Sequence, residues 1–239
     1  MLRITDLTKI FNSTVRAVDG LNLEVASGEV YTMLGANGAG KTTTINLILN
    51  FIEPTSGEIW VNDINVVKNP LDAKRNLAYV SENVMLYENL NAYQNLGFFA
   101  ELAGKKQIRF DEMNQILNRV GLTKEQCHRK LKTYSKGMRQ KCGIAIAILK
   151  QAKLILLDEP TSGLDPKSGK EFLDLLCEFR EEGKTVFMTT HDIFRARAIA
   201  DKIGIMNDGK LLREITRSEI ESINLEKIYI EYIDQKTAA

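Results

Sequence analysis

The feature that most constrains this chain is an eight-residue stretch, GANGAGKT, at residues 35–42. It matches the pattern Gly-x-x-x-x-Gly-Lys-Ser/Thr. A β-rich run at residues 30–34 comes directly before it, and an apolar-periodic segment at residues 45–51 comes directly after it. Glycines at Gly38 and Gly40 let the backbone fold its N–H groups around a phosphate. The context therefore predicts a strand, a phosphate-binding loop and a helix, in that order.

The side chains of this loop predict a bound nucleotide and a divalent metal ion. Lys41 places a positive charge near the β- and γ-phosphate oxygens, and the Thr42 hydroxyl can ligate Mg²⁺. The alternative is a glycine-rich turn that binds no nucleotide, and the flanking strand and helix argue against it. The residues of this segment that we expect to contact the nucleotide are Asn37, Gly38, Ala39, Gly40, Lys41, Thr42 and Thr43.

A second candidate anion site lies about a hundred residues later, in the stretch YSKGMRQK at residues 134–141. Ser135 can cap the first turn of a helix, Gly137 allows close approach to the backbone, and two further basic side chains follow. Residues 104–141 carry eleven Lys and Arg against three Asp and Glu, a local excess of eight positive charges. That excess belongs either to a solvated helical face or to an anion-facing surface. One nucleotide does not need two phosphate sites on the same chain.

The composition excludes several classes of protein. The formal net charge is +1, so nothing global draws the chain to nucleic acid or to an acidic membrane. The three cysteines are widely spaced and form no C-x-x-C pair, which fits a reducing cytosol and indicates neither a disulfide framework nor a zinc site. The apolar run at residues 142–149 is far shorter than the roughly 20 residues of a membrane-spanning helix. Asp6 comes too early for a secretory signal, so we expect any membrane role to come through a partner.

Short β-rich runs dominate the first third of the chain. Residues 21–25 alternate apolar and polar side chains, which predicts an antiparallel sheet with one exposed face. The other early strands that we expect are residues 2–7, 30–34, 59–61 and 77–80.

The pattern then becomes helical, from about residue 85 to residue 141, with no convincing strand. Strand character returns at residues 154–157 and 186–190, two continuous apolar runs typical of a parallel sheet, with a helical crossover at residues 169–182 between them. We therefore expect an α/β fold with a mostly parallel sheet, the core of a P-loop NTPase. Its parts are expected to be a core at residues 1–84 and 142–215 that includes an N-terminal antiparallel β subdomain, an inserted α-helical subdomain at 85–141, and a short tail at 216–239.

Two carboxylates follow the strand at residues 154–157. Asp158 suits the metal side of a nucleotide site, and Glu159, one residue further on, could orient or deprotonate an attacking water. Acidic residues at a strand end are often only solvated, but a phosphate loop in the same chain favours catalysis.

The order of these motifs resembles a known family. Phosphate loop, helical insert, YSKGM and LILLDEP follow one another, with Asp158 only 24 residues after Tyr134. In this the chain is similar, over nearly its whole length, to the ATPase subunits of ATP-binding cassette transporters. Their phrase at YSKGM is usually LSGGQ, so Ser135 and Gly137 are kept here, whereas Lys136 replaces a glycine.

The resemblance implies ATP and Mg²⁺ as ligands and a second ATPase subunit as partner, giving a homodimer. Ser135 and Gly137 would face the γ-phosphate of ATP held at Lys41 of the opposite subunit. A helix that is merely capped by Ser135 is the alternative. Hydrolysis would remove the bridging γ-phosphate and let the two subunits separate.

Further site residues follow from the same resemblance. Asp165 would reach toward the opposite site, or simply cap a helix before Pro166. His191 would sense the γ-phosphate and help hold Glu159 and water as a catalytic residue. Phe11 would stack on the adenine, unless it is a core residue, and Val18 would add apolar contact.

Glu82 lies where the family usually has a glutamine that touches Mg²⁺ and water. We expect it to act as a metal ligand, together with Thr42 and Asp158, and as a catalytic residue. A carboxylate cannot donate a hydrogen bond when ionised, so its water-orienting part differs. Glu82, the phrase LYENL at residues 86–90 and the phrase NLEKIY at residues 224–229 resemble the branch that energises exporters of small molecules, ions and lipids.

These implications predict a peripheral ATPase on the cytoplasmic face of the cell membrane that drives a separate integral permease, with no nucleic acid as partner. The surface that begins near Met85 would receive the permease, whose own residues would contact the transported substrate. One alternative is a soluble cassette ATPase that acts on ribosomes or DNA, although such proteins usually carry two cassettes or a long coiled-coil insert. Another is a small-molecule kinase that uses the same phosphate loop.

Overall fold

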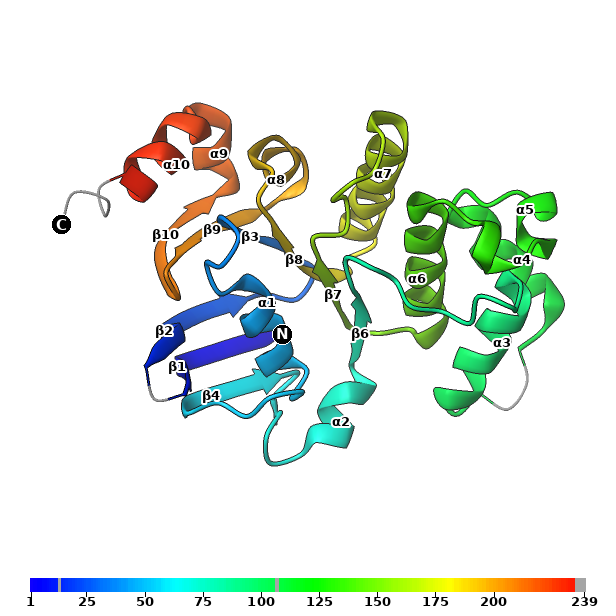
Figure 1. Cartoon of the computed structure of the whole chain (residues 1–239), viewed down its shortest axis with the longest axis horizontal. Coiled ribbons are helices and arrows are strands. Elements are labelled where there is room, and N and C mark those ends of the chain that lie inside the picture. Colours follow the sequence, from blue (N-terminus) through cyan, green and yellow to red (C-terminus); the bar gives the residue numbers. More distant parts are fainter. Residues whose placement is uncertain (13, 106–107, 235–239) are drawn as a thin grey trace.

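The computed structural model describes residues 1–12, 14–105 and 108–234 of the 239-residue chain. Figure 1 shows two β-sheets with helices around them, and beside them a helical part that runs from α3 (Ala92–Leu102) to α6 (Lys136–Lys150). The expected fold class is confirmed: an α/β core with a mostly parallel sheet, an N-terminal antiparallel sheet and an inserted set of helices.

The smaller sheet is antiparallel and comes from the start of the chain. Its strands, in spatial order, are β2 (Val15–Val25), β1 (Leu2–Phe11), β4 (Ser56–Val61) and β5 (Ile64–Asn65). In β2 the residues Leu21, Leu23 and Val25 are buried, while the residues between them are exposed. The alternation therefore predicted the exposed face correctly.

The larger sheet has one antiparallel edge and is otherwise parallel. In spatial order its strands are β10 (Lys210–Thr216), β9 (Lys202–Asn207), β3 (Val30–Leu34), β8 (Thr185–Thr190), β7 (Leu154–Asp158) and β6 (Leu77–Val80). Every residue of β3, β7 and β8 is buried, as their continuous apolar runs predicted. Strands β9 and β10 were not predicted from the sequence.

The crossovers bring the ends of the parallel strands to one edge of the sheet. Helix α1 (Lys41–Ile48) follows β3, α7 (Pro166–Glu181) connects β7 to β8, and α8 (Ile193–Ile199) follows β8. Strand β3 pairs in parallel with β8, which pairs in parallel with β7. The segments that follow β3, β7 and β8 therefore begin side by side, which is where ligands bind in sheets of this kind.

Each face of the larger sheet has its own apolar core. One core lies between the two sheets around α1 and includes Tyr31, Met33, Ile45 and Phe187. The other joins the opposite face to α6 and α7 and includes Ile155, Leu157 and Val186. Alternate residues of a strand point to opposite faces, so a fully apolar strand is buried on both sides.

The helical part packs against the edge strand β6 through α6. Between α3 and α6 lie α4 (Phe110–Arg119), α5 (Lys124–His128) and a 3₁₀ turn (Leu131–Thr133). No strand occurs among the described residues between 85 and 141, as expected, apart from one isolated bridge that pairs Asn91 with Lys130. Helix α6 runs without a break across residues 141 and 142, where we expected the insert to end and the core to resume.

The remaining helices lie at the periphery. Helix α2 (Pro70–Arg75) precedes β6, and α9 (Arg217–Ser222) and α10 (Leu225–Asp234) follow β10. Within the part of the chain that the structure describes, no helix is long and apolar enough to cross a membrane.

Candidate active site

The phosphate loop connects β3 to α1 and folds tightly over the core. Gly40, directly before the helix, has a left-handed backbone with φ of 108°, and a Cβ built there would collide with the carbonyl oxygen of Ala17. Only glycine fits this position without strain. The Lys41 side chain is buried and curls back over its own loop, where Nζ donates to the carbonyl oxygens of Gly35 (2.8 Å) and Ala36 (3.1 Å).

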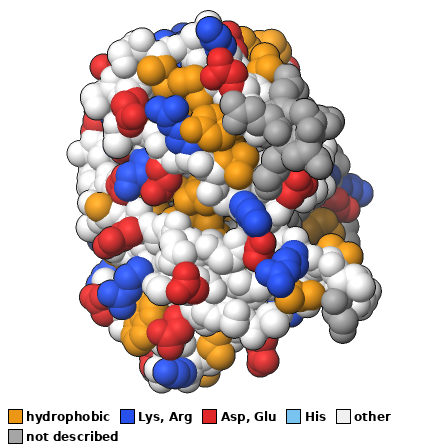
Figure 2. Space-filling model, turned by 90° about the vertical axis from the view of Figure 1, so that its left-hand side faces the viewer, with side chains coloured by type: hydrophobic (Ala, Val, Ile, Leu, Met, Phe, Trp, Pro, Cys, Tyr) orange, Lys and Arg blue, Asp and Glu red, His pale blue; other side chains and the backbone are white. Residues whose placement is uncertain are grey.

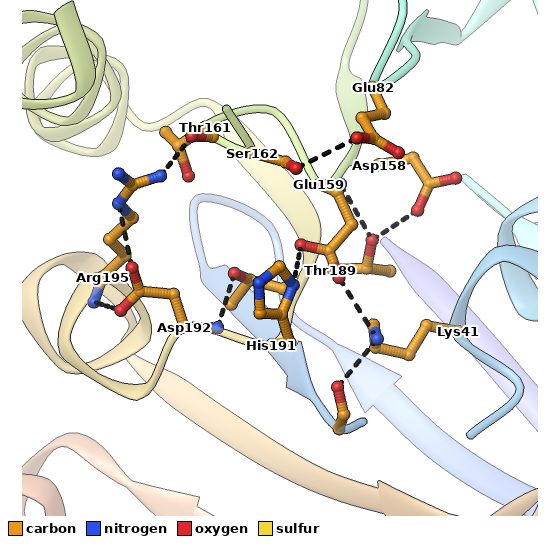
Figure 3. Close-up of polar contacts among 12 residues, drawn as sticks. Lys41, Glu82, Asp158, Glu159, Thr161, Ser162, Thr189, His191, Asp192 and Arg195 are labelled. Carbon is orange, nitrogen blue, oxygen red and sulfur yellow. Dashed lines mark hydrogen bonds and ion pairs between the residues drawn. The ribbon is translucent and has the colours of Figure 1, made fainter. Parts of the chain in front are cut away.

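Three of the predicted site residues meet in one chain of contacts. Lys41 Nζ lies 3.2 Å from Glu159 Oε1, and Glu159 Oε2 lies 2.9 Å from His191 Nδ1. Figure 3 shows the Glu159 carboxylate between the other two side chains. Lys41 begins α1 after β3, Glu159 follows β7 and His191 follows β8. The carboxyl ends of these parallel strands lie side by side, which brings the three side chains together.

The backbone of Glu159 is itself unusual. Its φ is +45°, a left-handed value that side-chain-bearing residues rarely adopt. The Glu159 amide donates to the Thr189 carbonyl oxygen (3.1 Å) and to Thr189 Oγ1 (3.2 Å), which fixes this turn against the neighbouring strand. Strain of this kind persists where the surroundings hold it, and it concentrates at functional sites.

Asp158 is held by two hydroxyl groups. Its Oδ1 accepts hydrogen bonds from Thr189 Oγ1 (2.6 Å) and Thr42 Oγ1 (3.2 Å). Burial raises the pKa of Asp158 above its usual value, and the two hydroxyl donors partly oppose that shift. The predicted metal ligands Thr42 and Asp158 are thus in direct contact.

This pair of oxygen ligands fits Mg²⁺. The ion commonly takes one or two carboxylates and fills its remaining positions with water and substrate phosphates. No cluster of three or more His, Cys, Asp and Glu residues that could hold a metal occurs in the described residues.

Glu82 makes different contacts from those expected of a metal ligand. Its Oε1 accepts a hydrogen bond from Ser162 Oγ (3.0 Å) and lies 3.4 Å from Lys136 Nζ. The Ser162 hydroxyl, and then Lys136, lower the pKa of Glu82 below its usual value. The described structure records no hydrogen bond between Glu82 and either Thr42 or Asp158.

The second anion site is a capped helix start, set apart from the phosphate loop. Ser135 Oγ accepts from the Met138 amide (3.3 Å) at the first turn of α6. A Cβ built at Gly137 would lie 3.2 Å from the Ser168 side chain, so the start of α6 packs closely on the start of α7. No hydrogen bond or ion pair between described residues joins residues 135–137 to residues 35–43.

Asp165 lies beside this contact. It caps α7, because Oδ1 accepts from the Ser168 amide (3.0 Å) and Oδ2 accepts from Ser168 Oγ (2.6 Å), and these bonds lower the pKa of Asp165. The capping alternative is therefore observed. It leaves the role toward an opposite subunit as a prediction.

The basic side chains of residues 134–141 are each paired within the chain. The closest charged atoms of the pairs are 3.4 Å apart for Lys136 and Glu82, 3.1 Å for Arg139 and Glu88, and 2.7 Å for Lys141 and Glu171. These acidic partners lie outside residues 104–141, so the local excess counted from the sequence overstated the positive charge of this surface.

The two residues expected to contact adenine differ in exposure. Phe11 lies at the end of β1 with 37% of its surface exposed, and Lys9 Nζ lies 5.1 Å from the centre of its ring. Its ring can accept a stacked base. Val18 is fully buried among the residues of the core between the sheets, because the pleat of β2 turns it inward. Contact between Val18 and a base is therefore not available in this structure.

Several residues of the site were not identified from the sequence. Arg195, on α8, donates from its guanidinium to the Thr161 carbonyl oxygen and pairs with Asp192 (3.0 Å), directly after His191. Figure 3 shows this link on the opposite side of the site from Glu82. Thr189, which contacts the Asp158 carboxylate and the Glu159 amide, is one of three threonines in β8, and all three are buried.

Comparisons with known proteins found relatives of this chain. The family model described as ABC transporter matches residues 18–162. The chain is 38% identical to the bacitracin transport ATP-binding protein BcrA of Bacillus licheniformis, over all of this chain and 77% of that protein. It is 36% identical to the daunorubicin/doxorubicin resistance ATP-binding protein DrrA of Streptomyces peucetius, over 92% of this chain and 67% of that protein.

Solved structures show the same similarity. A dimeric, post-hydrolysis state of the ATP-binding cassette MJ0796 bound to ADP and Pi aligns with a TM-score of 0.80 at 27% identity, over 91% of this chain and 99% of that one. CbiO1 from Clostridium perfringens, described as part of the ABC transporter complex cbiONQ, aligns with a TM-score of 0.82 at 25% identity, over 96% and 93% of the two chains.

Proposed function

Because this chain belongs to the ABC transporter family, as an ATP-binding subunit whose activity is ATP hydrolysis, we propose that two copies close around two ATP molecules and drive a separate membrane permease. The observation that carries the proposal is the separation of two anion-binding features. Lys41, Glu159 and His191 meet at one edge of the sheet, whereas the capped start of α6 makes no bond to the phosphate loop. The second feature is thus available to the nucleotide of another subunit.

Each side chain at the sheet edge has a distinct part in hydrolysis. Lys41 would release Glu159 and the loop carbonyls to bind phosphate oxygens, and Thr42 and Asp158 would hold Mg²⁺. Mg²⁺, when bound, neutralises charge that develops on the phosphates. Glu159 would then be free to orient and deprotonate the attacking water, with His191 fixing its carboxylate from the other side.

Closure of the dimer would complete both sites. Ser135 and Gly137 of one copy would face the γ-phosphate bound by the other. Asp165 would lie nearby, because Ser168 packs on Gly137 and donates a hydrogen bond to Asp165. One helix N-terminus contributes only about 0.3–1 kcal/mol toward an anion. Two sites with several charge-assisted contacts each would make closure depend on ATP. The dimeric state of the similar cassette bound to ADP and Pi supports this arrangement.

We propose an exporter of small molecules as the complete machine. The names of two relatives refer to bacitracin transport and to daunorubicin/doxorubicin resistance, which favours that class of substrate. The permease would bind on the cytoplasmic side, at the surface that begins with Met85, where Met85, Tyr87 and Leu102 are exposed apolar side chains.

The nucleic-acid alternative receives no support from the face shown in Figure 2, where acidic and basic side chains are interspersed. Ion pairs such as Lys210 with Asp19 and Arg213 with Glu219 illustrate this mixture at β10 and α9. A protein that follows nucleic acid backbones needs a basic patch or stripe instead.

The dimer is tested with Glu159→Gln. We expect this variant to bind ATP, to hydrolyse it at a small fraction of the normal rate, and to elute as a dimer on gel filtration only when ATP is present. Lys41→Ala in the same background should remain a monomer because it loses the nucleotide. An ATP-loaded monomer of Glu159→Gln would contradict the composite site.

The permease is tested by affinity purification from membranes. We expect an integral membrane protein to co-purify with the chain. Salt-sensitive co-purification with RNA or DNA, without a membrane protein, would support the alternative instead.

A further inference from the structure

Glu82 connects two segments that the sequence separates widely. A single carboxylate oxygen, Oε1, receives Ser162 Oγ at 3.0 Å and Lys136 Nζ at 3.4 Å. Ser162 lies in the turn between β7 and α7, and Lys136 is the first residue of α6. Figure 3 shows Glu82 directed toward Ser162.

One face of helix α6 packs against residues 80–82, the Glu82 segment. Four residues after Lys136, Gln140 is fully buried, and its Nε2 donates to the carbonyl oxygens of Ser81 (3.1 Å) and Glu82 (2.8 Å). Side chains four residues apart on a helix lie on the same side. One turn further along, a Cβ built at Gly143 would lie 3.0 Å from Val80. The helix and the Glu82 segment are therefore fixed to each other at three successive levels.

The turn that carries Ser162 is held from both sides. A Cβ built at Gly163 would lie 3.5 Å from Lys136 Nζ, so the lysine stem runs across this turn. On the opposite side, Arg195 binds the carbonyl oxygen of Thr161, next to the segment that carries His191. Residues 161–163 thus contact both α6 and α8.

We propose that Glu82 is a positioning residue that joins the start of α6 to the 161–165 turn through Lys136 and Ser162, so that the two segments close over nucleotide as one unit. This inference rests on the proposed function, because the start of α6 and the 161–165 turn would both face the ATP that the opposite subunit binds. It also explains why a glutamate is matched with a lysine. A carboxylate accepts from a hydroxyl and an ammonium group together, whereas glutamine would carry no charge to attract Lys136.

The competing role for Glu82 is the one expected from the sequence, a ligand of Mg²⁺. The two roles differ in what Lys136 does. If Glu82 is a metal ligand, it acts without Lys136. Loss of the Glu82 carboxylate then raises the Mg²⁺ concentration needed for half-maximal hydrolysis. If Glu82 is a positioning residue, it acts through Lys136 and Ser162. Loss of the Glu82 carboxylate then lowers kcat and leaves the Mg²⁺ requirement unchanged.

The experiment measures kcat, KM for ATP and half-saturating Mg²⁺ for the full chain and for Glu82→Gln, Lys136→Met and the double variant. Each single variant should lose about threefold to tenfold in kcat, the range set by a charge-assisted hydrogen bond and a partly exposed ion pair. The double variant should be no slower than the slower single variant, because both remove the same link. Lys136→Arg should keep most of the activity, and Ser162→Ala should resemble Glu82→Gln.

Glu182→Gln is the matched control. Glu182 pairs with Arg119 between α4 and α7, and the exposed side-chain fractions of that pair, 45% and 30%, match the 44% and 32% of Glu82 and Lys136. We expect Glu182→Gln to leave kcat unchanged. Thermal unfolding of each variant shows that the fold is intact, and Ser162→Ala provides a milder removal of the same contact.

Three results would overturn the proposal: multiplied losses in the double variant, an increased Mg²⁺ requirement in Glu82→Gln alone, or a kcat that rises in Glu82→Gln. These results would leave the ATP-driven dimer in place. A wild-type chain that shows no ATP-dependent dimer and no permease partner would instead contradict the proposed function.

Discussion

Lys41 Nζ lies 3.2 Å from the carboxylate of Glu159, so the lysine expected to bind phosphate is paired with the glutamate expected to activate water. Both side chains are almost fully removed from solvent, with 5% and 11% exposed. A buried lysine of this kind needs a negative partner. A triphosphate can replace Glu159 in that position, which would release the carboxylate only when nucleotide is present.

This competition predicts a change in nucleotide affinity. Glu159→Gln removes the negative charge that competes with the nucleotide for Lys41, so we expect ADP to bind about fivefold more tightly, equivalent to about 1 kcal/mol. ADP is the right probe because neither protein hydrolyses it. Isothermal titration calorimetry of the two proteins at the same Mg²⁺ concentration measures the difference. Weaker binding by the variant would show that Glu159 supports nucleotide binding instead of opposing it.

The two histidines offer an internal comparison for catalysis. His191 Nδ1 contacts Glu159, whereas His128 packs near the Tyr93 ring in the helical part. We expect His191→Ala to lower kcat about a hundredfold or more, as is usual for loss of a group that acts on the catalytic base or its proton. ADP affinity should change little. His128→Ala should hydrolyse ATP at the normal rate, and equal losses in both variants would show a general effect on the fold.

The sequence predicted those parts of the site that follow from local order along the chain. The run LILLDE placed two carboxylates at a strand end, and the fully buried β7 confirms the strand. The contact between Glu82 and Lys136 could not be predicted in this way, because 54 residues separate them and α6 must first dock on β6.

Strand register explains another difference. The pairing of β1 with β2 shifts between Leu7 and Lys9, and Val18 pairs with Lys9 just after that shift. A one-residue shift exchanges the two faces of a strand. Whether the Val18 side chain points to the core or to solvent therefore depended on this register shift, which the alternation of apolar and polar residues did not reveal. Strand β9 was missed for a different reason. Gly204 interrupts its apolar run, and a Cβ built there would collide with the Tyr31 hydroxyl.

Thr189→Val tests the hydroxyl that holds the Asp158 carboxylate and the Glu159 backbone in place. The change keeps the shape of the side chain but removes the donor to Asp158 Oδ1 and the acceptor for the Glu159 amide. We expect the free energy of unfolding to fall by about 1–3 kcal/mol, the usual consequence of leaving buried polar groups without a partner. The pKa of Asp158 should rise further, because the Thr189 hydrogen bond lowers it. Urea unfolding measures the first effect, and an increased Mg²⁺ requirement for hydrolysis would report the second.

The three cysteines test the packing of the helical part against the core. Cys142, on α6, is fully buried, and burial raises the pKa of its thiol to about 12, while Cys127 on α5 is buried as well. Cys177, on α7, is only partly buried. Since the thiolate is the reactive form, we expect a maleimide at neutral pH to label Cys177 first and to label the other two only after unfolding in urea. Peptide mass spectrometry identifies the labelled site, and the Cys177→Ser variant should give an unlabelled native protein. Labelling of Cys142 in the native protein at the rate of Cys177 would mean that α6 separates readily from β6, and Glu82 could not then hold the start of α6 against the 161–165 turn.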